Sequence, residues 1–414
     1  MVSGNRPWLL LALVSVAGIL ALISFALWPV FLIRLGPDWG LSNADIGWVS
    51  GAYFAGYLLA TPVLVGLTDR IDAKLVFLGG CAFSISGCLL FALYAHDFWS
   101  AALPWGLVGA GLAGTYMPGL QILNARLSAS DRLHAVPWYT ACFGIGTGGS
   151  FALMGFLLGF ADAHFAAMLG AVSSVMAAVL IAVFVARQPL VDLPENSPRR
   201  HPLDLRPAFK KPVALSYIAA YGAHTYELFA YRTWSFAMLV FLASRMDGGV
   251  GIGTITAIVS LITVSGMLAS LIGAHLCLRF GRHRVIALIG GGAAIMSLVS
   301  ALLLDSSFWA VVVMLWVYNI FIMLDSGSLT TGTVEAASAH DRGALLAVHS
   351  MIGFGGGALG GPVIGYVLDH TGGGTSLDAW FYALLAMGIG SAIVFLIQYN
   401  FWRRRTSYNS GQTE

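Results

Sequence analysis

Residues 211–245 read KPVALSYIAAYGAHTYELFAYRTWSFAMLVFLASR, a run apolar enough to cross a bilayer as one helix. Three ionisable side chains, His224, Glu227 and Arg232, nevertheless lie near its middle. An unpaired charge at mid-membrane costs from roughly 3 to more than 10 kcal/mol, so these groups must face each other, water or a ligand rather than lipid. This helix is therefore the first place to look for function.

One face of this helix is polar and aromatic. At about 100° per residue, His224, Glu227 and Tyr231 share that face and Trp234 extends it, whereas Arg232 lies roughly a quarter-turn away. Such a face is typical of a substrate path. The alternative is that Glu227 and Arg232 pair with charges on neighbouring helices and only hold a bundle together, but the pattern favours the functional interpretation.

The composition places the whole chain in the membrane class. Of its 414 residues, 58% are hydrophobic and only 10% are charged, with a mean hydropathy of +0.82, whereas soluble domains carry about 25% charged residues. The 50 glycines let helices approach closely, and the 12 tryptophans favour the membrane interfaces. The four cysteines show no CxxC or metal-ligand spacing, so we expect them to be buried packing residues.

Apolar stretches of about 20 residues predict twelve transmembrane helices. They cover residues 8–33, 46–66, 75–95, 99–125, 136–160, 164–186, 213–243, 253–277, 284–304, 308–333, 344–368 and 377–401. The first run is too long for a signal-peptide core, so we interpret it as an uncleaved first span. Twelve spans leave both termini on the same side of the membrane.

The basic residues predict which side that is. Arg34 and Arg245 lie on the opposite side and Arg232 lies within the membrane, so the remaining 18 of the 21 Lys and Arg residues share the side of the termini. The positive-inside rule therefore predicts that both termini are cytoplasmic. We expect an integral protein of the plasma membrane, which is the inner membrane in a bacterium.

A long polar segment divides the spans six and six. It reads RQPLVDLPENSPRRHPLDLRPAFKK and is rich in Pro and charge, as linkers are. We therefore expect an N-terminal six-helix bundle at residues 1–186, a cytoplasmic linker at 187–212, and a C-terminal six-helix bundle with a short cytoplasmic tail at 213–414.

The two halves resemble each other at an offset of about 209–210 residues. The recurring residues are Arg70 and Arg279, Phe98-Trp99 and Phe308-Trp309, Asp131-Arg132 and Asp341-Arg342, and Gly144, Gly146 and Gly148 with Gly353, Gly355 and Gly357. We infer a duplicated six-helix unit. In that arrangement a site forms at the interface between the halves, and rocking alternates its access.

The loop after the second span resembles a family signature. Residues 65–74 read VGLTDRIDAK and match the G-x-x-x-D-R-x-G-R-R/K pattern of the major facilitator superfamily in Asp69, Arg70 and Lys74, while Asp72 replaces the second Gly. In that family these residues tie helix ends together on the cytoplasmic side and bias the conformational switch. The resemblance implies a gating role here, with simple positive-inside anchors as the alternative.

A second copy of the signature lies in the corresponding loop of the second half. Residues 274–283 read AHLCLRFGRH and keep Arg279, Gly281 and Arg282, but Leu278 stands where the acid should be. The resemblance extends the gating role to Arg279 and Arg282.

The glycine-rich fifth and eleventh spans are similar to the corresponding helices of the nitrate/nitrite and cyanate transporter branches. They read FGIGTGGSFALMG and IGFGGGALGGPVIG. Tight packing is the alternative explanation, because helices without side chains can close on one another. The nitrate porters bear an Arg in the second and eighth spans, and residues 46–66 and 253–277 contain none, which argues against nitrate itself.

Ionisable groups gather in the second half. Asp325 lies near the middle of the tenth span with Asn319 six residues before it, and His349 lies about one and a half turns into the eleventh. Asp325 and Arg232 can neutralise each other as a buried pair. A protonatable carboxylate next to an Arg and a His is also the minimum needed to couple proton movement to an anion.

These residues form two predicted sets. We expect solute binding by Arg232, Tyr231, His224 and Asn319, and proton coupling by Asp325, Glu227 and His349. The first half has no acid in its first span and lacks the Arg that proton-linked drug exporters usually bear near the start of the fourth span, so any coupling is expected in the second half.

Missing motifs exclude several functions. The chain has no G-x-x-x-x-G-K-[ST] stretch and its longest polar segment is too short for a nucleotide-binding domain, so direct ATP drive within this chain is excluded. It also lacks HExxH, a Cys/His cluster and a Ser nucleophile elbow. We expect no enzyme activity, cofactor, metal site or nucleic-acid partner.

The leading hypothesis is an all-α membrane protein with the major facilitator fold, two pseudo-symmetric six-helix bundles, acting as a secondary active transporter by alternating access. We expect a small, polar, anionic solute, because Arg can hold a carboxylate or oxyanion bidentately. The alternatives are an exporter of a cationic or amphipathic compound or of a metal ion, and a non-transporting scaffold or sensor. We expect a monomer whose partners are the solute and the lipid bilayer; proton coupling, exchange, facilitated diffusion, and import or export all stay open.

Overall fold

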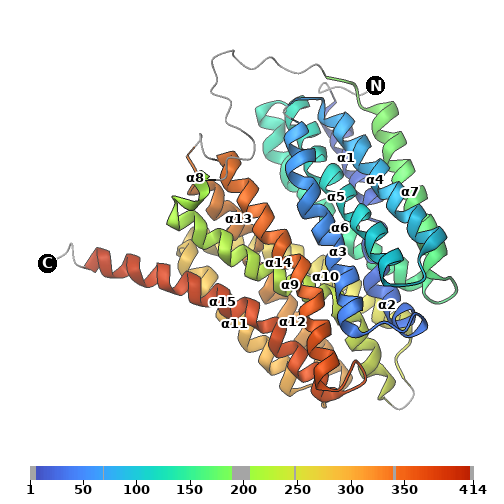
Figure 1. Ribbon diagram of the computed structural model, residues 1–414. Coiled ribbons are helices and arrows are strands. Elements are labelled where there is room, and N and C mark those ends of the chain that lie inside the picture. Colours follow the sequence, from blue (N-terminus) through green and yellow to red (C-terminus); the bar gives the residue numbers. More distant parts are fainter. Residues whose placement is uncertain (1–5, 69, 189–205, 247–248, 339–341, 411–414) are drawn as a thin grey trace. The chain divides into compact units, whose positions relative to one another are not determined.

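The computed structural model describes residues 6–68, 70–188, 206–246, 249–338 and 342–410, which are almost entirely helical (Figure 1). The chain groups into two compact units. The first comprises Met1–Leu41 and Ala52–Pro202, and the second comprises Ser42–Gly51 and Leu203–Glu414. Each unit is described by itself below.

Within each unit, consecutive helices are joined by short connections. Those that lie wholly or mainly in the first unit are α1 (Pro7–Ala21), α2 (Leu27–Asp38), α3 (Asn43–Leu67), α4 (Ala73–Tyr94), α5 (Phe98–Arg126), α6 (Ala129–Leu157) and α7 (Ala163–Phe184). Those of the second unit are α8 (Arg206–Phe209), α9 (Pro212–Ser244), α10 (Ile252–Phe280), α11 (Arg282–Leu302), α12 (Phe308–Leu324), α13 (Ser326–Glu335), α14 (Arg342–Thr371) and α15 (Leu377–Ser410).

The helices suit a membrane-spanning bundle. Nine helical segments of the described residues are long and apolar enough to cross a membrane, namely α3, α4, α6, α7, α10, α11, α12 with α13, α14 and α15. Three more fit the expected twelve: α1 with α2, α5, and α9. Glycine, proline and polar residues lower the hydropathy of α5, and the ionisable groups near the middle of α9 do the same there. The all-α membrane fold that the sequence predicts is confirmed.

The first span is broken, which the sequence does not predict. Instead of one helix over residues 8–33, α1 ends at Ala21 and α2 begins at Leu27. A break frees backbone groups that lipid cannot satisfy. Ser150 of α6 satisfies two of them, since its hydroxyl donates to the carbonyl of Ile23 at 2.6 Å and accepts the N–H of Ala26 at 2.9 Å.

The tenth span is broken as well, and here the break falls on a predicted site residue. The expected helix over residues 308–333 divides into α12 and α13 at Asp325. The N–H of Gly327, in the first turn of α13, donates to the hydroxyl of Ser270 on α10 at 3.2 Å. As in the first span, a hydroxyl from a neighbouring helix takes the place of a backbone partner.

The glycine-rich α14 is the surface on which α9 packs. A Cβ at Gly356 would lie 2.1 Å from the carbonyl oxygen of Gly222, and one at Gly360 would lie 2.4 Å from that of Tyr226. These glycines are therefore required for close approach, as the packing alternative proposed. The hydroxyl of Thr225 adds a hydrogen bond to the carbonyl of Gly353 at 2.6 Å.

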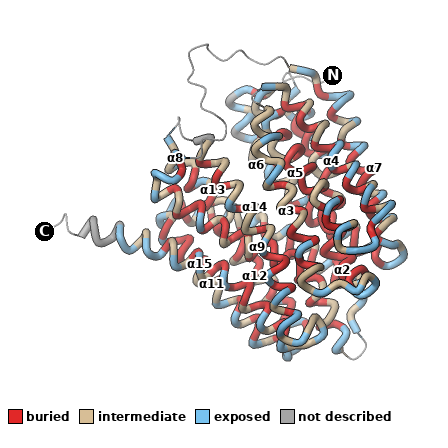
Figure 2. Tube along the Cα trace, in the orientation of Figure 1, coloured by how far each residue is buried: buried red, intermediate tan, exposed pale blue. Residues whose placement is uncertain are grey.

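Burial follows the packing within each unit. Figure 2 shows α9 buried along most of its length, and the buried residues of α9 include His224, Glu227 and Arg232. By contrast, α10 exposes large apolar side chains such as Leu268 and Leu271, as a helix that faces lipid does. The polar groups of α9 therefore face protein, as the sequence requires.

Candidate functional site

The predicted face of α9 is fully buried in the second unit. His224, Glu227, Tyr231 and Trp234 are each no more than 3% exposed. The helices that contact α9 include α8, α10, α12, α13, α14 and α15. Every polar side chain on this face therefore meets a neighbouring helix, and its partners decide what it can do.

His224 lies against Asp325 at the break between α12 and α13. The imidazole Nδ1 and a carboxylate oxygen of Asp325 are 2.8 Å apart, and both side chains are at least 95% buried. The sequence left open a buried pair between Asp325 and Arg232, but the structure pairs Asp325 with His224 instead. His224 was predicted to bind solute and Asp325 to couple protons, so this contact joins one residue of each predicted set.

Glu227 is anchored by two hydroxyl groups. Tyr318 of α12 donates to Oε1 at 2.5 Å, and Ser391 of α15 donates to Oε2. Both oxygens of this carboxylate therefore have a partner inside the unit, which is what a buried polar group needs. Tyr318 and Ser391 were missed by sequence reasoning, because a single hydroxyl in an apolar span gives no signal.

Two of the predicted solute-binding side chains are held by backbone carbonyls. The hydroxyl of Tyr231 donates to Leu315 of α12 at 3.0 Å, and the side-chain amide of Asn319 donates to Ile262 of α10 at 3.0 Å. These bonds tie α9, α10 and α12 together. To contact a solute, either side chain would have to give up this bond or accept a hydrogen bond through its own side-chain oxygen.

Arg232 differs from its neighbours because no described residue forms an ion pair with it. It is 7% exposed, and its Nε has no hydrogen-bond partner among the described residues. Its guanidinium lies over the ring of Phe229, 5.8 Å from the centroid. A cation–π contact offsets only part of the cost of burying a charge. This guanidinium can therefore still accept an anion.

His349 and His224 are joined by an aromatic stack. The ring of Tyr221 stacks with both, with centroid separations of 3.9 Å to His349 and 5.8 Å to His224. Sequence reasoning missed Tyr221, although it lies one turn before His224 on the same helix. The stack places both imidazoles in one buried region of the second unit.

Both ring nitrogens of His349 meet hydroxyl groups of α13. Nδ1 is 3.2 Å from Thr333 and Nε2 is 3.2 Å from Thr330. The Thr333 hydroxyl donates to the carbonyl of Leu329, so it accepts the proton of Nδ1. The Thr330 hydroxyl can donate to Nε2 or, at 3.5 Å, to the carbonyl of Ser326. Both nitrogens of the neutral imidazole therefore have a hydrogen-bond partner. If Nε2 is protonated, the Thr330 hydroxyl can accept a hydrogen bond from it instead of donating one.

The predicted gating residues of the first unit have different environments. Asp69 lies outside the described residues, and Arg70 is exposed. Lys74 is buried, and its ammonium group donates to the carbonyls of Ala182 and Val185 at 2.9 and 2.6 Å. Lys74 therefore caps the C-terminus of α7, where free carbonyls favour a cation.

Asp72 forms an ion pair that sequence reasoning missed. Both of its carboxylate oxygens accept from Nη2 of Arg126 at 2.9 Å, and the N–H of Gln188 donates to it at 2.8 Å. Burial alone would raise the pKa of Asp72, but these bonds outweigh it and hold the pKa below its ordinary value. The available signal was Asp72 itself, which replaces the second Gly of the signature, together with Arg126 at the end of another helix.

The gating residues of the second unit also differ from each other. Arg279 is exposed, and its guanidinium lies 5.1 Å from the centroid of the Phe280 ring. Arg282 forms a bidentate pair with Glu335, which ties the start of α11 to the end of α13. The two residues thus share a loop but not an environment.

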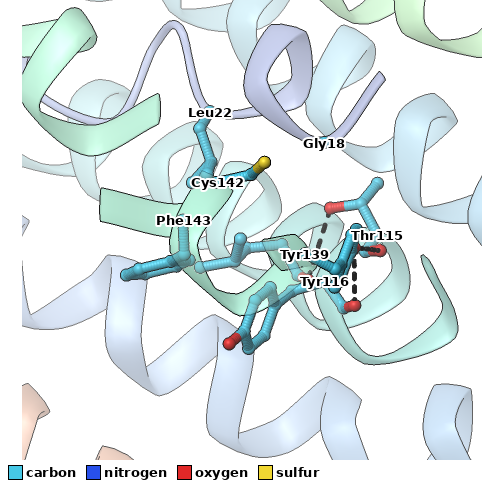
Figure 3. Close-up of a pocket in the computed structure, with 8 residues that line it drawn as sticks. Gly18, Leu22, Thr115, Tyr116, Tyr139, Cys142 and Phe143 are labelled. Atoms are coloured by element: carbon cyan, nitrogen blue, oxygen red, sulfur yellow. Dashed lines mark hydrogen bonds between the residues drawn. The ribbon is translucent and has the colours of Figure 1, made fainter. Parts of the chain in front are cut away.

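A small cavity lies in the first unit between α1, α5 and α6 (Figure 3). Its volume is about 10 Å³, enough for about one water molecule. Thr115, Tyr116 and Tyr139 contribute its polar atoms, and the Tyr139 hydroxyl donates to the carbonyl of Tyr116 at 2.9 Å.

In the described parts of the chain, no three His, Cys, Asp or Glu side chains gather as metal ligands would.

Comparison with protein families matches most of the chain. A family model described as Major Facilitator Superfamily matches residues 13–361. The match is to the superfamily, so the narrower resemblance to the cyanate and nitrate/nitrite branches stays a prediction.

Solved structures share the fold at low sequence identity. The crystal structure of the nucleoside transporter NupG is 18% identical with a TM-score of 0.72, covering 95% of this chain and 99% of that one. A bacterial homolog to the human lysosomal transporter Spinster, inward-facing and unoccupied, is 15% identical with a TM-score of 0.78, covering 97% and 99%. At such identities the likeness concerns the fold alone.

A curated relative matches over a shorter stretch. The quinolone resistance protein NorA of Staphylococcus aureus is 30% identical over 161 residues, 37% of this chain and 39% of that protein. The alignment thus spans about two fifths of the length of the curated relatives that the chain matches.

Proposed function

Because the chain belongs to the major facilitator superfamily, a family of transporters, we propose that it is a secondary active transporter of a small, polar, anionic solute. In this proposal the six-helix halves at residues 1–186 and 213–414, joined by the linker at 187–212, alternate the access of one site. The plasma membrane, cytoplasmic termini and a monomeric state belong to the same proposal.

The buried guanidinium of Arg232 is the observation that supports an anionic solute. Its guanidinium is buried without an ionic partner among the described residues, which is costly unless a ligand completes it. A carboxylate or oxyanion fits this need, because the planar guanidinium can donate two parallel hydrogen bonds to it. The bound solute would then supply the missing partner of Arg232.

We propose that His224 and Asp325 form the proton-coupling pair. At 2.8 Å the imidazole and the carboxylate are within ion-pair distance, so the carboxylate would stabilise a proton on the imidazole. The pair also lies at a break in a span, and discontinuous helices form the solute and ion sites of many transporters. This assignment moves His224 from the solute-binding set to the coupling set.

His349 extends this proton path in our proposal. If the Thr330 hydroxyl turns from Nε2 to the carbonyl of Ser326, Nε2 can take up a proton. His224 and His349 both stack with the ring of Tyr221, so two protonated rings would place like charges in one buried region. We therefore expect one positive charge to be shared between them at a time.

Gating is proposed for the exposed basic residues of the two signature loops. Lys74 and Arg282 are held by partners within their own units, whereas Arg70 and Arg279 are exposed. We propose that Arg70 and Arg279, with Asp69, bias the conformational switch, and that Lys74 and Arg282 fix the helix ends beside them.

The experiment that tests the anion assignment compares Arg232→Gln and Arg232→Lys with the wild type in proteoliposomes. A panel of small carboxylates, inorganic oxyanions and amines is supplied as solute. We expect uptake of at least one anion, an increase in KM of at least about tenfold in Arg232→Gln, and a smaller increase in Arg232→Lys, which keeps the charge but loses the bidentate donor.

Arg245→Gln is the matched control. Arg245 lies beyond the same helix, is exposed, and pairs with Asp305 at 3.1 Å, so its replacement should leave anion uptake unchanged. Normal anion KM in Arg232→Gln would refute the anion assignment. So would a panel in which only amines are transported.

Efflux of an amphipathic compound is the second candidate. The observation in its favour is the partial similarity to NorA, whose name links it to quinolone resistance. Under this alternative the buried carboxylates Glu227 and Asp325 would meet a cationic substrate. The amine arm of the panel, supplemented with a fluoroquinolone, distinguishes it from anion transport.

A further inference from the structure

Helix α10 carries a row of hydroxyl groups that the proposed transport site does not yet use. The row consists of Thr256, Ser260, Thr263 and Ser270, whose spacing places them on one face of a helix. From Thr256 to Ser270 the helix rises about 21 Å. We refer to these four residues as the α10 hydroxyl stripe.

A hydrogen bond of Ser270 shows which way the stripe faces. Its hydroxyl accepts the N–H of Gly327 at 3.2 Å, two residues after Asp325 at the break between α12 and α13. Helices α13 and α10 both contact α9. The stripe is therefore turned toward the buried helices of the second unit, whereas exposed residues such as Leu268 and Leu271 lie on another face of α10.

Two hydroxyls of the stripe lack a hydrogen-bond partner among the described residues. Thr256 is 5% exposed, and its hydroxyl makes no hydrogen bond within the part of the chain that the structure describes. The hydroxyl of Ser260, one turn further, is buried and makes none there either. Thr263, by contrast, donates to the carbonyl of Val259 at 2.8 Å. Burying a hydroxyl without a partner is unfavourable, so a ligand that supplies the partner is bound more tightly.

The unpartnered hydroxyls lie near the depth of Arg232. Helix α9 ends at Ser244 and α10 begins at Ile252, and consecutive spans run in opposite directions across a membrane. Arg232 is about 18 Å from that end of α9, and Ser260 is about 12 Å from that start of α10. The axes of helices in contact lie about 8–10 Å apart. A small solute held by the guanidinium can therefore also meet the stripe.

We propose that Thr256 and Ser260 bind a hydroxyl group of the solute, while Arg232 binds its anionic group. This inference rests on the proposed function and narrows the solute to a small hydroxylated anion, such as a hydroxy acid or a sugar acid. A solute hydroxyl can both donate and accept, as Ser and Thr hydroxyls can, so one such group can complete both missing partners. A site built to hydrogen-bond a hydroxyl rejects the analogue that lacks it.

Isothermal titration calorimetry of the purified full chain tests this site with matched anions. Isethionate and ethanesulfonate share a permanently charged sulfonate and differ in one hydroxyl, and glycerate and propionate form a second pair. We expect the wild type to bind the hydroxylated member about tenfold more tightly. The double variant Thr256→Val with Ser260→Ala should bind both members equally, with an unchanged affinity for the member that lacks the hydroxyl.

Two further variants serve as controls. Thr256→Ser with Ser260→Thr keeps both hydroxyls and should keep the preference. Ser300→Ala removes a buried hydroxyl of α11 that likewise has no partner among the described residues but lies off the stripe, so it should keep the preference too. An equal loss of preference in Ser300→Ala would overturn the assignment to the stripe.

Thermal unfolding separates solute binding from packing. Because the two hydroxyls lack partners, Thr256→Val with Ser260→Ala should leave the apparent unfolding temperature of the unliganded protein unchanged or raise it. A fall of several degrees would show that these hydroxyls hold the bundle, which would overturn the solute site. Equal binding of both members of each pair by the wild type would overturn it too but leave the anion assignment intact. Binding of none of these anions would refute the anion assignment, and this inference with it.

Discussion

Glu227 and Asp325 are both buried carboxyl groups of the second unit, but their partners differ in kind. Glu227 accepts hydrogen bonds from the hydroxyls of Tyr318 and Ser391. These hydroxyls donate hydrogen bonds but stay uncharged near neutral pH. Asp325 faces the imidazole of His224, which can be protonated. We infer that Asp325 is the better candidate for proton exchange and that Glu227 mainly anchors α9.

This difference leads to a prediction about two isosteric variants. Asp325→Asn should abolish the proton uptake or release that accompanies solute binding, while leaving the apparent unfolding temperature nearly unchanged. Glu227→Gln should keep the proton signal but lower stability by about 2 kcal/mol, because hydrogen bonds to a charged group are weakened. A pH-indicator dye in weakly buffered solution measures the protons, and a thermal unfolding scan measures stability.

The opposite pattern would exchange the two roles. If Glu227→Gln removed the proton signal and Asp325→Asn did not, Glu227 would be the coupling carboxylate. Ser173→Ala serves as the control, since Ser173 is a buried hydroxyl of α7 in the first unit that donates to the carbonyl of Leu20 at 2.8 Å.

The sequence identifies the charged members of this region but not their partners. His224, Glu227, Arg232 and Asp325 are visible because a charge in an apolar run demands an explanation. The hydroxyls that bind Glu227 and His349 come from other helices, and Ser, Thr and Tyr are ordinary in membrane spans. Which charge meets which hydroxyl depends on helix rotation, which hydropathy does not encode.

At the scale of helices, the two broken spans share one construction. In each, a serine hydroxyl from a neighbouring helix binds backbone groups that the break exposes. Hydropathy predicts the length and position of a span well. It cannot predict a hydrogen bond between a backbone group and a side chain more than fifty residues away. The spans were therefore predictable and the breaks were not.

Ser150 offers a test of how much such a bond contributes. Ser150→Ala would leave the carbonyl of Ile23 and the N–H of Ala26 without their hydroxyl partner, at a cost of about 2 kcal/mol. We expect the apparent unfolding temperature to fall by several degrees.

The control for that variant lies on α1. Ser15 is also buried, but its hydroxyl has no hydrogen-bond partner among the described residues, so Ser15→Ala should be neutral or stabilising. Equal destabilisation by the two variants would show that Ser150 acts by packing rather than by supporting the break.

At the scale of the whole molecule, the sequence suffices for the fold class and the family. Composition and span count predict a helical membrane protein, and the loop signature predicts the superfamily that the family model then matches. The solute is not predictable in the same way. The proposed site consists of one buried guanidinium and one imidazole–carboxylate pair, and many small anions would fit it.

The driving force is the property of the whole molecule that one experiment can decide. Transport against a gradient without ATP needs an ion or a counter-solute, and the His224–Asp325 pair is our candidate for carrying a proton. If one proton accompanies each monovalent anion, the process is electroneutral. A gradient of one pH unit, with the membrane potential clamped at zero, should then accumulate the solute about tenfold in proteoliposomes. Asp325→Asn should abolish this accumulation but preserve exchange of labelled for unlabelled solute.

If transport by the wild type does not depend on the pH gradient and occurs only when solute is present inside, the protein is an exchanger. In that case Asp325 and His224 serve only to hold the break between α12 and α13.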